Sequence, residues 1–304
     1  MRSSASRRWK GSCIEQTRST ASASTSRSSP VTERTSPVRR RYLLGLYAVT
    51  EREILKFLRQ YERLLSAIIR PSLWLFIFAT GLQNLLGISI IPPYQTYTPY
   101  QEYILPGLVG IIILFQCMQS ALSMVYDREA GVMRVMLVTP LPRSYLLLAK
   151  IMGATILSML QAYVFLGLAA LVGYYTTLAG MIWIAPAMLL SGLMLGSIGL
   201  LITVYTRQIE NFAGLMNFVI FPMFFMSSAL YPLWKLQESG ASLLHDIALF
   251  NPFTHAVELI RFAAYGQMNW TSCAVVVGVA LVAFGLSARG YDPNRGSIRM
   301  IKRG

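Results

Sequence analysis

Six long apolar runs constrain the fold of this chain more than any other feature of its sequence. They cover about 72–91, 103–125, 146–173, 181–204, 212–232 and 271–288. Each is close to the ~20 residues that an α-helix needs to cross a bilayer, and hydrocarbon accepts a spanning segment only as a helix or a closed barrel. Charged residues make up only 13% of the chain. The sequence therefore predicts an all-α integral membrane protein with six transmembrane helices.

The two ends of the chain differ in composition from the apolar runs. Residues 1–41 are rich in Ser, Thr and Arg, so we expect a disordered basic tail that cannot bury a core. This segment has no apolar stretch of the kind found in secretory signals. An organelle targeting segment, or a start assigned too far upstream, is the alternative. Residues 42–290 are expected to form the transmembrane domain, and residues 291–304 a basic cytoplasmic tail.

An amphipathic segment precedes the first apolar run and reads "TEREILKFLRQYERLLSAIIRP" over 50–71. Thr50 and Glu53 have the spacing of a capping box at a helix start. One helical stripe is apolar and the opposite side is basic, with Ile54, Leu58, Tyr61, Leu65 and Ile68 against Arg52, Lys56, Arg59 and Arg63. This pattern predicts an interfacial helix in the headgroup plane. A core-facing soluble helix is the alternative.

The distribution of basic residues indicates the orientation in the membrane. If the connections between the six runs alternate, 25 of the 27 Lys and Arg residues fall on one side, and only Lys235 and Arg261 on the other. The positive-inside rule then places both termini in the cytoplasm. We expect a multi-pass protein of the plasma membrane, which is the inner membrane in a bacterium. Because most of the +14 net charge flanks apolar runs, it does not indicate nucleic-acid binding.

Several motifs of energy-consuming and metal-dependent proteins are absent from the sequence. There is no G-x-x-x-x-G-K-[ST] and no H-E-x-x-H, so the chain has no nucleotide-binding P-loop and no zinc-protease site. Asp and Glu are nearly absent inside the apolar runs, which disfavours an ion-coupled pump. His245, Asp246, His255 and Glu258 have no known ligand spacing, so we expect no metal site, and an ion pair of Glu258 with Arg261 instead.

A short helix is predicted before the last apolar run, within "NPFTHAVELIRFAAYG" over 251–266. Asn251 suits the N-cap and Pro252 the first helical position, and Gly266 suits the stop. The helix from Pro252 to Tyr265 would be about 21 Å long, which is too short to span. Together with the amphipathic segment 236–250 it predicts an outer re-entrant helical hairpin.

Small and polar residues inside the apolar runs indicate where helices pack. Gly192, Gly196 and Gly199 form a small-residue face that permits close helix packing. Hydrocarbon does not solvate amides, so those in or near the runs should face the bundle interior or a partner. They are Gln83, Asn84, Gln116, Gln119, Asn211 and Asn217. Hydrogen bonds between helices are one interpretation. Gln83, Asn84 and Asn217 are also candidates for lining a transport pathway.

Two motifs and their order resemble the type-2 ABC exporter permeases. The first is "YDREAGVMRVMLVTPLPRSYLLLAK" from Tyr126 to Lys150, and the second is the 251–266 segment. The layout is also similar, with an amphipathic helix ending in Arg-Pro, six spans and both ends inside. The resemblance covers about residues 45–290. Arg134 departs from it, because many members carry an acidic residue there.

The resemblance implies a permease homodimer or close heterodimer with two copies of a separate ATP-binding subunit. ATP would be bound by that partner, and the chain itself would hold no cofactor. A helix from about Asp127 to Val138 is implied to be the coupling helix, ended by Thr139–Pro142. The implied coupling residues are Asp127, Glu129, Gly131, Arg134, Pro140 and Arg143; those of the outer helix are Asn251, Pro252, Glu258 and Arg261. The first and fifth spans are implied to line the dimer interface.

The function implied is that of a permease subunit of an ATP-driven exporter, which is not itself an enzyme. Its cargo would be amphipathic: a drug, lipid, glycolipid or polysaccharide. The fold does not fix the cargo. A non-transporting membrane scaffold is the first alternative. A membrane-embedded lipid-modifying enzyme is the second, and it would have to use the group around His245 and Glu258.

Overall fold

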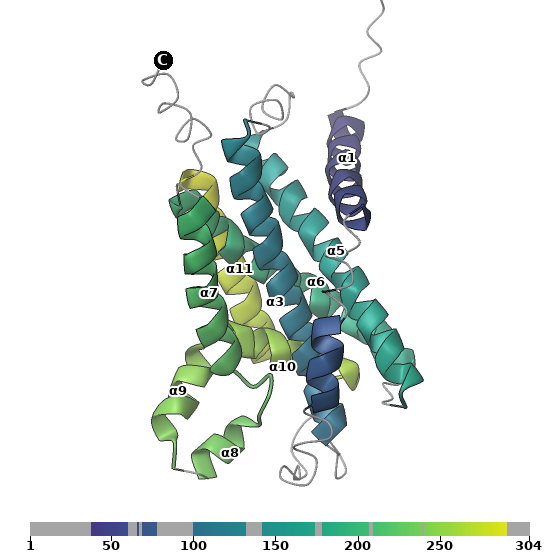
Figure 1. The fold of residues 1–304 in the computed structure, drawn as a ribbon, viewed down its shortest axis with the longest axis vertical. Coiled ribbons are helices and arrows are strands. Elements are labelled where there is room, and N and C mark those ends of the chain that lie inside the picture. Colours follow the sequence, from purple (N-terminus) through teal and green to yellow (C-terminus); the bar gives the residue numbers. More distant parts are fainter. Residues whose placement is uncertain are drawn as a thin grey trace, which may run out of the picture. The chain divides into compact units, whose positions relative to one another are not determined.

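Helices make up the secondary structure of the residues described by the computed structural model, which are 38–59, 66, 69–77, 100–131, 142–173, 178–206, 209–238 and 240–290. The chain divides at Arg40, and the contacts below belong to the unit Arg41–Gly304. The helices are α1 (Val38–Leu58), α3 (Tyr100–Glu129), α5 (Arg143–Leu171), α6 (Leu178–Tyr205), α7 (Ile209–Phe225), α8 (Leu233–Glu238), α9 (Ser242–Phe250), α10 (Pro252–Ala264) and α11 (Trp270–Gly290) (Figure 1).

Four of these helices are long and apolar enough to cross a membrane. They are Glu102–Glu129 within α3, all of α5, Ala179–Tyr205 within α6, and all of α11. The all-α integral membrane class is therefore confirmed. Of the first predicted run, 72–91, the structure describes a helix only as far as Ile77, and the rest lies outside the described residues.

The fifth predicted run, 212–232, does not form one continuous helix. Helix α7 ends at Phe225 after 17 residues. The Ser227 hydroxyl donates to the Phe224 carbonyl at 2.7 Å and accepts from the Ala229 amide at 3.3 Å. A serine side chain that bonds its own neighbouring backbone competes with helix propagation. The turn after α7 is therefore built by local hydrogen bonds that apolarity alone does not predict.

The N-terminal helix begins earlier than predicted. Helix α1 passes through Thr50 without interruption, so the capping box of Thr50 and Glu53 is wrong, and residues 38–41 are helical. The upstream turns pack on α5, where the Tyr42 and Tyr145 rings lie 4.9 Å apart, edge to face. The Tyr145 hydroxyl also donates to the Tyr42 carbonyl at 2.6 Å. These contacts stabilise helix before Thr50. Beyond Arg59, most of the predicted amphipathic helix lies outside the described residues.

Helix α6 packs against α3, α5, α10 and α11, and its face of small residues makes contacts with α5 and α3. A Cβ atom at Gly192 would lie 2.5 Å from Thr155 Cγ2. One at Gly196 would lie 2.7 Å from Ile151 Cγ2, and one at Gly199 would lie 3.0 Å from Ala121 Cβ. The predicted close packing at these glycines is therefore confirmed. It takes place within the bundle, against α5 and α3.

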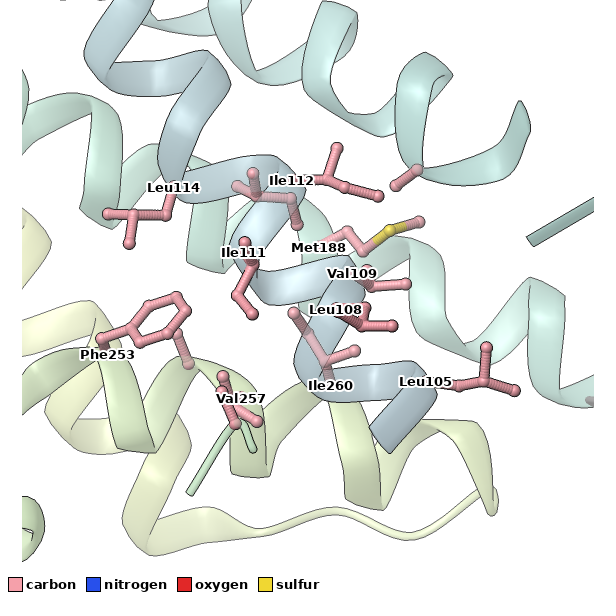
Figure 2. Close-up of a cluster of buried hydrophobic side chains, with 14 of the residues drawn as sticks. Leu105, Leu108, Val109, Ile111, Ile112, Leu114, Met188, Phe253, Val257 and Ile260 are labelled. Atoms are coloured by element: carbon pink, nitrogen blue, oxygen red, sulfur yellow. The ribbon is translucent and has the colours of Figure 1, made fainter. Parts of the chain in front are cut away.

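The core forms where α10 crosses α3 and α6. Phe253, Val257 and Ile260 of α10 are fully buried, and Figure 2 shows them directed at the side of α3 that carries Leu108 and Ile111. Glycine permits this approach, because a Cβ at Gly110 would lie 2.8 Å from Val257 Cγ2. Helix α10 is therefore a core helix, buried on more than its apolar stripe.

Candidate functional site

Three helices meet at a cluster of charges near the end of α3. Lys150 of α5 donates to Asp127 of α3 with 2.5 Å between Nζ and Oδ2, and the two side chains are 4% and 7% exposed. Arg52 of α1 lies 3.5 Å from the other carboxylate oxygen and is more exposed. Burying either charge alone would carry a large desolvation free energy, and the attraction between the two charges offsets it. The cluster fixes α1 to the end of α3 and the start of α5.

The chain leaves α3 directly after this cluster. Asp127 belongs to the last turn of α3, which ends at Glu129, and Gly131 has a φ of 73°. Glycine adopts this left-handed conformation without steric cost. The expected helix from Asp127 to Val138 is therefore wrong at its start, because Asp127 continues a spanning helix and Gly131 interrupts the α conformation. Glu129 is exposed next to the turn.

Two other residues of the predicted coupling set, Arg134 and Pro140, lie outside the described residues. Arg143 is the first residue of α5 and is exposed, and Pro142 precedes it as the N-cap with φ −63° and ψ 143°. This agrees with the predicted role of the prolines in starting the third span. The described members of the coupling set therefore lie at two helix ends, with Asp127 buried and Glu129 and Arg143 at the surface.

Arg128 connects the same end of α3 to the end of α6. Its guanidinium donates to the carbonyl of Thr203 at 3.0 Å and to the carbonyl of Thr206. The last carbonyls of a helix have no partner within the helix, and a cation there also interacts favourably with the helix dipole. One side chain of α3 thus bonds to carbonyls at the C-terminus of α6, directly after the residue of α3 that pairs with α1 and α5.

The second group of predicted residues lies at the start of α10. The Asn251 side chain caps this helix, since its Oδ1 accepts from the Phe253 amide at 3.0 Å, and Pro252 occupies the first turn. Both predictions are confirmed. Asn251 Nδ2 also donates to the carbonyls of Met223 at 2.8 Å and Met226 at 2.6 Å. One amide therefore caps α10 and the C-terminal end of α7 together.

Helix α10 ends at Ala264, one residue before the predicted end at Tyr265. The predicted glycine stop is present. Gly266 has a φ of 67°. Its amide donates to the Ala263 carbonyl at 2.9 Å, and the Gln267 amide donates to the Phe262 carbonyl at 3.0 Å. This pair of bonds is the Schellman arrangement, which satisfies the free carbonyls at a helix end.

Arg261 is buried at the centre of a polar network beside the turn that follows α7. Its guanidinium forms the predicted ion pair with Glu258, donates to the Ser228 carbonyl at 2.8 Å and lies 3.9 Å from the centroid of the Tyr103 ring. The Tyr103 hydroxyl donates to the same Ser228 carbonyl at 3.1 Å. The network ties α3 and α10 to the turn that follows α7.

Tyr100 adds a further bond to this turn, donating to the Leu230 carbonyl at 2.5 Å. Burial raises the pKa of the Tyr100 hydroxyl to about 12, although the nearby Arg261 cation lowers it. The hydroxyl therefore remains a neutral donor throughout the physiological pH range. The turn is also close to α3, because a Cβ at Gly107 would lie 2.0 Å from the Ala229 carbonyl oxygen.

The histidines near this network take part in local contacts. His255 Nε2 lies 3.0 Å from the Leu249 carbonyl and its Nδ1 lies 3.4 Å from the Ser272 hydroxyl. His245 lies next to Asp246, with 3.4 Å between Nδ1 and Oδ1. Within the described ranges, no three His, Cys, Asp or Glu side chains are grouped as metal ligands would be.

The polar residues predicted in the spans are divided between several environments. Gln116 accepts a hydrogen bond from Gln161 at 3.1 Å, joining α3 to α5, as expected for amides between helices. Asn217 is exposed on α7. Gln83 and Asn84 lie outside the described residues.

Sequence reasoning missed several members of these networks, among them Arg128, Gln161, Tyr100, Tyr103 and Ser228. Each contact joins residues far apart in the chain, and Ser228 takes part through its backbone carbonyl. Lys150 offered the clearest signal, since a cation within an apolar run implies a buried partner.

Comparison with known proteins agrees with this architecture. The sequence profile of the ABC-2 type transporter family matches residues 45–265, which is most of the chain, and the chain belongs to this family. It is 28% identical over 240 residues to the transport permease ycf38 of Cyanophora paradoxa, covering 75% of this chain and 77% of that protein.

Two bacterial proteins are also similar to this chain. Nodulation protein J of Rhizobium leguminosarum bv. viciae is 24% identical over 206 residues, covering 67% of this chain and 75% of that protein. The inner membrane transport permease YadH of Escherichia coli K12 is 21% identical over 243 residues, covering 79% of this chain and 90% of that protein. The chain is thus a membrane transport permease by family.

Proposed function

We propose that this chain is the membrane-spanning subunit of an ATP-driven exporter that moves an amphipathic cargo out of the cytoplasm. The observation that carries the proposal is the buried pair of Asp127 and Lys150 with Arg52 beside it. It joins α1 to the ends of two apolar helices. A force applied to α1 or to the turn at Gly131 would therefore reach α3 and α5 together.

The energy source is a separate subunit in this proposal. The sequence contains no P-loop, so ATP would be bound and hydrolysed by a partner, present in two copies, and the chain would hold no cofactor. The partner would contact the surface around Glu129, Gly131 and Arg143, which adjoins residues 132–141. The exposure of Glu129 and Arg143 supports this assignment.

The proposed topology has six spans, with both termini in the cytoplasm of a cell bounded by a plasma or bacterial inner membrane. The spans are the four long apolar helices, α7 and the helix that begins within 69–77. The distribution of 25 of 27 basic residues supports the orientation. The pair α9 and α10 would form the outer re-entrant hairpin. The position of both helices directly before α11 supports this assignment.

Two permeases would associate as a homodimer or a close heterodimer. The exposed face of α7 supports this, because it carries Phe218 at 75%, Phe221 at 52% and Phe225 at 46% exposure. On a proposed membrane span this aromatic face would contact a second permease, cargo or lipid. Asn217 is exposed on the same helix, and with Gln83 and Asn84 it is proposed to line the pathway.

Purification of the tagged full-length chain from its native membrane tests the proposal. A P-loop ATPase should co-purify, and transport by the reconstituted complex should require ATP. Gly131→Ala should uncouple ATP hydrolysis from transport. Gly173→Ala is the matched control, since Gly173 has a φ of 97° and, like Gly131, its added Cβ would meet no atom within 4 Å in the described part of the chain, but it lies beyond the C-terminal end of α5. Full transport by the chain alone would refute the proposal.

A further inference from the structure

A pocket opens within one protomer between the helix at 69–77 and the face of α3. It is lined by residues from four segments of the chain: Ser66, Arg70, Pro71, Trp74, Leu108, Ile111, Ile112, Phe115, Gln116, Gln119, Gln161 and Phe224. Its empty volume, with the open mouth included, is about 700 Å³.

The α3 wall of the pocket changes from apolar to polar along its length. Leu108, Ile111 and Ile112 lie toward the start of the helix, and Gln116 and Gln119 lie further on. From Leu108 to Gln119 an α-helix rises about 16 Å. This wall can therefore contact a short polar head and a length of apolar chain on one molecule.

The opposite wall follows the same order. The Arg70 guanidinium lies 5.2 Å from the centroid of the Phe115 ring, which places it beside the polar end of α3. Trp74, one turn later, packs edge to face on Phe224 of α7 with 5.1 Å between centroids. The end of α7 lies near the start of α3, because the Ser228 carbonyl in the turn after α7 accepts a hydrogen bond from the Tyr103 hydroxyl. Trp74 is therefore at the apolar end.

The polar end carries a cation and hydrogen-bond donors. Arg70 is the one charged residue among the described residues that line the pocket. Gln161 donates to Oε1 of Gln116, so that bond does not use the two N–H donors of Gln116. A guanidinium offers a planar set of donors that matches phosphate or carboxylate oxygens.

From this geometry, we propose that the pocket binds the anionic head group of an amphipathic cargo, with phosphate or carboxylate oxygens at Arg70 and Gln116. The tail lies along Leu108, Ile111 and Ile112. This inference rests on the proposed export function and specifies the chemical class of the cargo. Drugs and sugars without an anionic head are excluded from this site.

Binding of matched amphiphiles to the purified full-length permease tests the site. The probes are oleoyl lysophosphatidate, oleate and monooleoylglycerol, which share one tail and differ in the head. The two anions should bind about tenfold more tightly than the neutral probe, as expected for one charge-assisted contact. The ratio between lysophosphatidate and oleate decides between a phosphate and a carboxylate head. Native mass spectrometry measures the bound fraction.

Two variants with the same change in net charge separate the site from general attraction. Arg70→Gln should remove the preference for anions while leaving affinity for monooleoylglycerol unchanged. Arg289→Gln, at an exposed position in the last turn of α11, should keep the preference. Melting curves of both variants establish that they fold. Equal binding of charged and neutral probes, or an equal loss in both variants, would overturn the proposal.

A final measurement separates cargo from a resident lipid. The preferred anionic probe should stimulate ATP hydrolysis by the reconstituted complex of permease and ATP-binding subunit, and Arg70→Gln should reduce this stimulation. Binding without stimulation in a complex that hydrolyses ATP would overturn the role as a cargo site. Failure to find any ATPase partner would instead overturn the exporter function, and the binding preference would still be measurable on the permease alone.

Discussion

Lys150 and Asp127 form a buried ion pair, with 2.5 Å between Nζ and Oδ2, across 23 residues of chain. The intervening segment includes the turn at Gly131 and the proline-rich stretch before α5. The pair therefore closes a loop at its base and leaves residues 130–142 between two fixed helix ends.

Removal of one member of this pair should strongly destabilise the protein. Asp127→Asn leaves two cations without their carboxylate, and breaking a buried pair costs about 3–5 kcal/mol. Melting in detergent should fall well below wild type, and the double variant Asp127→Leu with Lys150→Met should recover most of the loss. Glu129→Gln makes the same change in charge at an exposed position and should melt near wild type. Equal melting of Asp127→Asn and Glu129→Gln would contradict the structural role.

Gly107 should not tolerate even one added methyl group. A Cβ there would lie 2.0 Å from the Ala229 carbonyl oxygen, and backbone cannot move aside as a side chain can. We expect Gly107→Ala to cost about 1–3 kcal/mol of stability through overpacking, measured as a lower melting temperature. Gly278→Ala in α11 is the control, because a Cβ at that glycine meets no atom within 4 Å in the described part of the chain. A neutral Gly107→Ala would show that the turn lies elsewhere.

Asn251 should be replaceable by neither aspartate nor alanine. Aspartate keeps the acceptor that caps α10 but loses both donors to the Met223 and Met226 carbonyls, and it places a charge near them. Alanine loses all three bonds. We expect both variants to lose about 1–3 kcal/mol, measured by thermal melting, although aspartate is an equally good N-cap in isolated helices. Wild-type stability of Asn251→Asp would mean that capping of α10 is the only role.

Lysine should not substitute for Arg261. A lysine ammonium cannot donate to Ser228, pair with Glu258 and cover the Tyr103 ring from one position, because it lacks the planar fork of a guanidinium. Arg261→Lys should therefore melt clearly below wild type. Tyr103→Phe keeps the ring and removes one hydrogen bond, so its loss should be smaller, about 1 kcal/mol. A larger loss for Tyr103→Phe than for Arg261→Lys would reverse this order of importance.

Local features of the sequence were sufficient to predict α10. Its N-cap at Asn251, its proline in the first turn and its glycine stop are contacts within a few residues, and each is present. The four long apolar helices were also predictable, since length and hydropathy decide membrane insertion. In both cases the physical cause lies inside the segment itself.

The errors arose where distant packing determines the structure. The Thr50–Glu53 spacing fits a capping box, but the same spacing also occurs inside a helix, and contacts of Tyr42 with Tyr145 extend α1 upstream. The family resemblance implies a separate helix beginning at about Asp127, whereas the structure places Asp127 within α3. The partner of Asp127 on α5 allows its charge to remain within the spanning helix.

The side chain of Asn251 holds the end of α7 and the start of α10 together. Separation of these two helix ends would break its hydrogen bonds to Met223 and Met226 at once. A tilt of α7 during transport would therefore carry α10 with it. Because α10 also packs against α3 and α6, the effect of such a tilt would extend into the core of the bundle.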